Sequence, residues 1–106
     1  MKKLTALVPV LEMIADRERH KLRHIQNKEQ ELRAKFAALE GASHPPDFSP
    51  AGLSGAHLVH EIWSQKARAQ LNLELAAVLA QKEDARIATG RAVGRLEVLR
   101  KICQER

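Results

Sequence analysis

One segment interrupts an otherwise continuous helix-forming chain. Residues 41–55, read as GASHPPDFSPAGLSG, hold three of the five glycines and three of the four prolines. Glycine ends helices, and Pro45 with Pro46 cannot continue one. We therefore predict two long helices, over about 5–40 and about 56–105, joined by this loop. At 1.5 Å per residue they would be roughly 54 and 75 Å long, which is too long for a compact globule.

The composition favours helices that pair with each other. Alanine, leucine, glutamate, arginine and lysine make up 58 of the 106 residues, a bias typical of long and coiled-coil helices. Aromatic residues are only 3% of the chain, so few are available for a broad globular core. A single cysteine excludes a disulfide scaffold. We expect an all-α protein with one domain over residues 1–106, in which two long helices form an antiparallel coiled-coil hairpin.

Apolar periodicity predicts which residues line the seam of the coiled coil. From Leu71 to Cys103 the seam positions recur in strict steps of four and three. In the first helix the predicted seam passes through Leu7 and Ile14 and then takes two successive steps of four. The start of the second helix, through Val59 and Trp63, does the same. Such double steps are stutters, which locally unwind a coiled coil.

Folding the chain back at the loop brings the two predicted stutters close together. This register places Leu7 opposite Thr89, and facing residue numbers total 96. Trp63 is then expected near Leu32 and Phe36. Agreement between two independently derived patterns is the main argument for this register.

In the same register the second helix continues for about fourteen residues past the start of the first. This overhang, residues 93–106, still carries Leu96, Leu99 and Ile102. An apolar stripe without an intramolecular partner usually marks an interaction surface. A frayed tail, or a register error of a few residues, would explain the same pattern.

Charge is concentrated at the joined termini. Residues 1–24 carry six basic and three acidic side chains and residues 85–106 carry six and two, whereas residues 25–84 carry six and eight. Solvated charged faces would explain the amount of charge but not its polarisation. We therefore take the terminal cations and the apolar overhang as candidate partner-binding residues: Lys2, Lys3, Arg17, Arg86, Arg91, Arg95, Leu96, Leu99, Arg100, Lys101 and Ile102.

No pattern in the sequence indicates catalysis or a cofactor. There is no glycine-rich phosphate loop and no nucleophile motif, so we expect no enzyme activity. His20 and His24 have the spacing of metal ligands, but Lys21 and Arg23 beside them would repel a divalent cation. Cys103 occupies a seam position and is interpreted as a small apolar filler. We predict neither a catalytic site nor a metal site.

Other patterns bear on location and partners. No apolar run approaches the 18 or so residues of a membrane span, and the apolar part of the N-terminal segment is too short for a signal peptide, so we expect a cytoplasmic protein without membrane insertion. A nucleic-acid-binding hairpin would fit the basic charge, but the chain lacks aromatic residues for base stacking. Alanines opposite the seam in residues 71–80 leave open a homodimerising adaptor.

The helical segments also resemble a known family. The first begins with Leu4-Thr5-Ala6-Leu7-Val8 and runs into Ile14-Ala15-Asp16-Arg17-Glu18-Arg19, and in this it resembles the FliJ/YscO family of flagellar and type III secretion proteins. The second, which opens with Ile62-Trp63 and ends in Leu96-Glu97-Val98-Leu99-Arg100-Lys101, is similar to that family too. The resemblance implies a cytoplasmic export component similar to the central stalk of rotary ATPases. It also implies that the joined ends enter the ring of the export ATPase, and that the protein engages the export gate and escorts chaperones.

Overall fold

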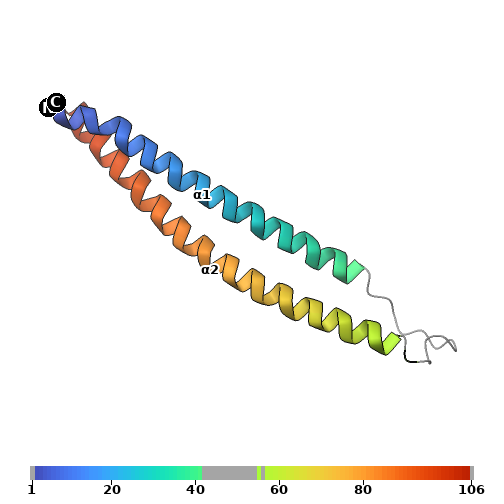
Figure 1. Ribbon diagram of the computed structural model, residues 1–106. Coiled ribbons are helices and arrows are strands. Elements are labelled where there is room, and N and C mark those ends of the chain that lie inside the picture. Colours follow the sequence, from blue (N-terminus) through green and yellow to red (C-terminus); the bar gives the residue numbers. More distant parts are fainter. Residues whose placement is uncertain (1, 42–54, 56, 106) are drawn as a thin grey trace. The chain divides into compact units, whose positions relative to one another are not determined.

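The chain forms two long antiparallel helices. A computed structural model describes residues 2–41, 55 and 57–105 (Figure 1). Helix α1 spans Lys2–Gly41 and helix α2 spans His57–Gln104, and the described residues contain no strand. The predicted all-α hairpin is confirmed. Of the predicted loop, residues 42–54 lie outside the described residues.

Burial follows an unbroken seam on each helix. On each helix one series of buried and half-buried positions recurs in alternating steps of four and three, as a coiled coil requires, and Glu12, Ala67, Ala88, Val93 and Gly94 are half-buried beside it. On α1 they are Leu4, Val8, Leu11, Ala15, Glu18, Leu22, Ile25, Glu29, Leu32, Phe36 and Leu39. On α2 they are Glu61, Ser64, Arg68, Leu71, Leu75, Val78, Lys82, Ala85, Thr89, Ala92, Leu96, Leu99 and Cys103.

The two predicted stutters are therefore wrong. The sequence pattern was assigned to the larger apolar residues, yet Leu7 and Ile14 are 47% and 43% exposed. Their smaller neighbours Val8 and Ala15 occupy the seam instead. At the start of α2, Trp63 is 60% exposed while the adjacent Ser64 is buried.

The helices pack in two compact units. Unit 1 comprises residues 1–27 and 79–106, and unit 2 comprises residues 28–78. In unit 1 the start of α1 lies beside the end of α2 (Figure 1). Its core is a cluster of Ala15, Ala92 and Leu96, against which Val8, Leu11 and Val93 pack.

Two polar contacts define the register of unit 1. The Thr89 hydroxyl lies 2.8 Å from the carbonyl oxygen of Ala85 and 3.2 Å from that of Glu18 on the other helix. Arg100 donates a hydrogen bond of 2.8 Å to Glu12. Thr89 and Glu18 have residue numbers that total 107, so the predicted register, with a total of 96 and Leu7 opposite Thr89, is wrong by eleven residues.

The predicted overhang is absent because α1 covers it. In the observed register the first turns of α1 pack along the last turns of α2, and Leu96 and Leu99 are only 3% and 8% exposed. Both residues belong to the core, so their assignment to an unpaired stripe is wrong. Ile102, at 40% exposure, remains accessible.

Unit 2 has a more polar seam. Leu32 is its one buried apolar residue among those described, whereas Glu29 and Ser64 are also buried. Arg33 donates a hydrogen bond of 2.8 Å to the Glu29 carboxylate. Trp63 lines a groove with Leu39, and its predicted neighbours Leu32 and Phe36 are not among the residues that line this groove.

The observed register and the register predicted from the sequence differ in which of two leucine-to-alanine substitutions should destabilise the protein more. Leu96→Ala should lower the free energy of unfolding by about 2–5 kcal/mol, because it leaves a cavity in the core of unit 1. Leu7→Ala, at a half-exposed position, should cost less than about 1 kcal/mol. Urea denaturation followed by circular dichroism measures both values. The reverse order would support the register with the overhang.

Candidate partner-binding site

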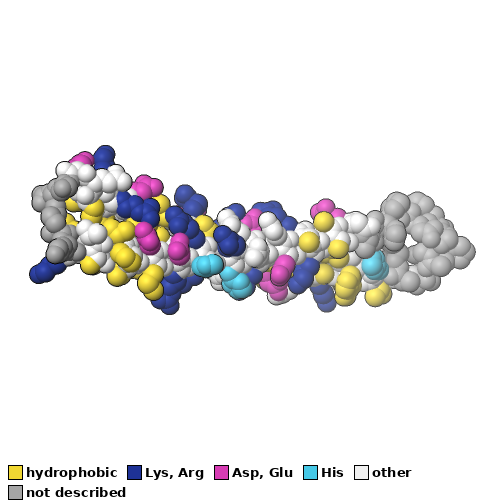
Figure 2. All heavy atoms as spheres, turned by 90° about the horizontal axis from the view of Figure 1, so that it is seen from above, with side chains coloured by type: hydrophobic (Ala, Val, Ile, Leu, Met, Phe, Trp, Pro, Cys, Tyr) yellow, Lys and Arg dark blue, Asp and Glu magenta, His cyan; other side chains and the backbone are white. Residues whose placement is uncertain are grey.

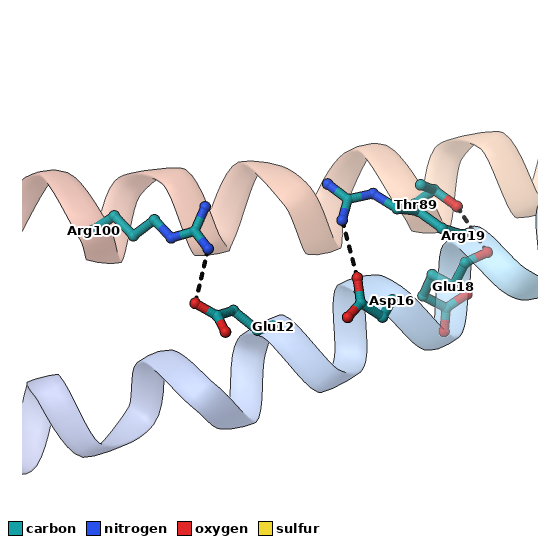
Figure 3. Close-up of polar contacts among 6 residues, drawn as sticks. All are labelled: Glu12, Asp16, Glu18, Arg19, Thr89 and Arg100. Atoms are coloured by element: carbon teal, nitrogen blue, oxygen red, sulfur yellow. Dashed lines mark hydrogen bonds and ion pairs between the residues drawn. The ribbon is translucent and has the colours of Figure 1, made fainter.

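The seam of unit 1 has two sides that differ in chemistry. On one side Glu12 and Arg100, which directly follow the seam residues Leu11 and Leu99, meet across the two helices (Figure 3). We call this side the paired flank. Arg19 contacts Asp16 at 3.1 Å and Arg86 contacts Glu83 at 2.7 Å, and by their spacing both pairs border the same flank.

The Arg86–Glu83 contact has two hydrogen bonds, of 3.0 and 2.7 Å, between the guanidinium and the carboxylate. These hydrogen bonds, followed by the positive charge of Arg86, lower the pKa of the Glu83 carboxyl below its ordinary value. The same contacts raise the pKa of Arg86. The contact thus favours the charged form of both groups, and each group is the hydrogen-bond partner of the other.

The opposite side of the seam is bordered by residues that directly precede seam positions, and we call it the open flank. In unit 1 these include Leu7, Ile14 and Arg17 on α1, and Arg91, Arg95, Val98 and Ile102 on α2. In an antiparallel pair such positions lie on the same side of the seam, just as Glu12 and Arg100 share the other. The open flank of unit 1 therefore combines exposed apolar side chains with cations.

A groove of about 630 Å³ runs along the open flank of unit 1. Val98 and Ile102 line it and are 60% and 40% exposed, and Gly94 leaves space because a Cβ there would meet no atom within 4 Å. In full, the groove is lined by Leu11, Arg91, Gly94, Arg95, Val98, Leu99 and Ile102. Figure 2 shows apolar side chains gathered over this unit beside Lys and Arg side chains. We call this site the terminal groove.

The cations of the terminal groove have no intramolecular counter-ion among the described residues. Arg91 and Arg95 line the groove, yet neither takes part in an ion pair or hydrogen bond there. Arg17 lies one turn beyond Ile14 by sequence spacing and likewise has no described partner. No acidic residue lines the groove.

The structure thus sorts the predicted site residues into groups. Arg91, Arg95, Leu99 and Ile102 line the terminal groove, with Leu99 at its buried edge. Leu96 is core, and Arg86 and Arg100 are engaged in ion pairs on the paired flank. Lys3 and Arg17 are exposed on α1, Lys101 is exposed on α2, and the side chain of Lys2 lies outside the described residues.

Sequence reasoning located Leu99 and Ile102 but missed other residues of this site and the apolar residues of the open flank beside it. Leu7 and Ile14 were assigned to the seam, and Gly94 and Val98 were not considered as site residues. The sequence did carry a signal that could have found them, namely which of two adjacent apolar residues continues the repeat of the seam. Val8 and Ala15 continue an unbroken repeat of four and three, whereas Leu7 and Ile14 require a stutter.

Unit 2 carries a second apolar surface. Leu58, Val59, Ile62 and Trp63 at the start of α2 are between 46% and 69% exposed, and we call them the α2 start patch. Trp63 stacks with His60, the ring centroids lying 6.0 Å apart. Beside it a groove of about 490 Å³ runs between Trp63 and residues of α1, including Leu39.

The described residues place no metal-ligand cluster at either surface. No three His, Cys, Asp or Glu side chains among them converge in a way that could hold a metal ion. Cys103 is a free, half-buried thiol at the seam. Neither α1 nor α2 contains a stretch apolar enough to cross a lipid bilayer. Both surfaces expose apolar side chains, and the terminal groove adds the cations Arg91 and Arg95.

The fold and the surface together define a helical hairpin with a candidate partner-binding groove at its terminal unit. Comparison with protein-family models, with curated proteins and with solved structures finds no match to this chain. The resemblance to the FliJ/YscO family therefore stays a prediction.

The Glu12–Arg100 pair should add little to stability. Both side chains are nearly half exposed, at 45% and 49%, and solvent screens such pairs. A double-mutant cycle with Glu12→Gln and Arg100→Gln, measured by urea denaturation, should give a coupling energy of about 0–1 kcal/mol. A coupling above about 2 kcal/mol would show that this pair, rather than the apolar core, sets the register.

Proposed function

We propose that the protein is a non-enzymatic, cytoplasmic component of a flagellar or type III protein export apparatus, which acts as a stalk or regulator of the export ATPase. The observation that supports this proposal best is the terminal groove, where apolar side chains and the unpaired cations Arg91 and Arg95 are exposed together. The sequence resemblance to the FliJ/YscO family supplies the identity of the partner. The export gate and chaperones are further partners on the same ground.

A binding role is supported by the fact that the residues that hold the two helices together differ from those that line the terminal groove. A stalk must keep its own helices paired while it presents a second surface to a ring. In unit 1 the seam buries Ala15, Ala92 and Leu96, and the groove residues Val98 and Ile102 remain accessible beside it. A partner can therefore contact the groove without opening the hairpin.

Charge reversal on the two flanks tests the proposal. Arg91→Glu with Arg95→Glu should abolish stimulation of the cognate export ATPase, because it removes the unpaired cations of the terminal groove. The matched control, Arg86→Glu with Arg100→Glu, changes the same number of charges on the paired flank and should retain at least half of the stimulation. Circular dichroism should show unchanged helicity for the groove variant, since exposed charges contribute about 0–1 kcal/mol to folding.

Salt provides an independent readout of the same interaction. The Debye length falls from about 10 Å at 0.1 M to about 3 Å at 1 M ionic strength, so binding to the ATPase should weaken as salt rises. Purified protein that neither binds nor stimulates the ATPase at low salt would refute the proposed function.

A second function, a homodimerising adaptor, is favoured by the α2 start patch. Large apolar side chains that stay exposed in a monomer are often covered by another chain. Under this function sedimentation equilibrium should give a dimer mass, and Ile62→Ser with Trp63→Ser should return it to the monomer mass. Met13→Ser, at a position 72% exposed on α1, is the control and should leave the mass unchanged. A monomer at all concentrations would exclude this function.

A further inference from the structure

The terminal groove has the form of a site for one additional helix. Its apolar lining comes from both helices, with Leu11 on α1 and Val98 and Ile102 on α2. Gly94 lies within it, and the absence of a side chain there lets another backbone approach closely. Amphipathic helices dock into such grooves through apolar side chains spaced at i, i+3 or i+4, and i+7.

The charges around the groove specify the partner further. Arg91 and Arg95 border the apolar floor, no acidic residue lines it, and neither arginine has a described counter-ion. Carboxylates on an incoming helix would supply the missing negative charge. We propose that the terminal groove binds an acidic amphipathic helix of a partner protein, with glutamates or aspartates beside its apolar stripe.

A second copy of this chain fits the groove less well. Two terminal grooves placed face to face would bring Arg91 and Arg95 of both copies together without an acid to separate them. Like charges at an interface oppose association. The occupant is therefore a different, acidic chain.

This inference rests on the proposed function only in taking the terminal unit as the binding end, and it deepens that function by naming the chemistry of the partner. The probe is a fluorescein-labelled synthetic peptide with leucines at i, i+4, i+7 and i+11 and glutamates at the flanking positions. A second peptide with lysines in place of the glutamates is its control. Fluorescence anisotropy with the full chain should give at least tenfold tighter binding for the glutamate peptide.

Two glycines of α2 provide matched variants that keep the fold. Gly94→Gln fills the terminal groove, whereas Gly90→Gln lies outside it, and a Cβ at either position meets no atom within 4 Å. Because glutamine favours helix more than glycine does, both variants should fold. The Kd of the glutamate peptide should rise at least tenfold in Gly94→Gln and change less than twofold in Gly90→Gln.

A second pair of variants probes the apolar floor. Val98→Glu should also raise the Kd at least tenfold, and Leu73→Glu, at an apolar position in unit 2 that is at least as exposed, should not. Equal affinity for the two peptides, or equal effects of the two glycine variants, would overturn the proposal. Binding to anionic phosphatidylglycerol vesicles without binding to the glutamate peptide would also overturn the proposal. A dimer of the protein that the peptide fails to dissociate would do the same.

The peptide assay contains no ATPase, so the two proposals can fail separately. Loss of peptide binding in Gly94→Gln with full ATPase stimulation would show that stimulation does not use the groove. Peptide binding by the parent protein, with no binding of the ATPase at low salt, would leave the groove assignment intact and refute the proposed function.

Discussion

The unbroken seam of four and three residues is the constraint on which the rest of unit 1 depends. It directs the small residues Val8 and Ala15 inward, where Ala15 packs with Ala92 and Leu96. Small residues in a seam allow two helices to approach closely, and the Thr89 hydroxyl accordingly lies 3.2 Å from a backbone carbonyl of the facing helix. The register, the buried residues and the two flanks all follow from this packing.

The fold could be predicted from the sequence because its determinants are local. The glycine and proline residues of 41–55 separate two stretches rich in helix formers, and the structure has helices on both sides of that segment. The register could not be predicted in the same way. A shift of eleven residues is one heptad plus one step of four, so alternate seam positions still fall on seam positions and the others miss by one residue. The apolar pattern, in which adjacent residues are often both apolar, therefore does not by itself exclude the shifted register. Tertiary packing of alanines, together with polar seam residues such as Ser64, decides between them.

Only part of the candidate site could be predicted, because its charges are local in sequence and its ion pairs are not. Counting charges along the chain located Arg91 and Arg95 in a basic terminal region, and both line the terminal groove. Counting charges could not show that Arg100, unlike these two arginines, has a counter-ion, because that counter-ion, Glu12, lies 88 positions away in the sequence. Whether a cation is free depends on contacts across the helix pair, and these contacts depend on the register.

The location of the apolar residues explains how one short hairpin can use different side chains for its own core and for binding a partner. Four of the five buried apolar residues in the described part of the chain lie in unit 1, so this unit has a core of its own beside an apolar flank. A two-helix coiled coil uses only one stripe of each helix, and Leu7, Ile14 and Val98 lie outside that stripe. A third helix placed on the open flank would extend the core instead of competing with it. Substitutions in the groove can therefore weaken recognition while the hairpin stays folded.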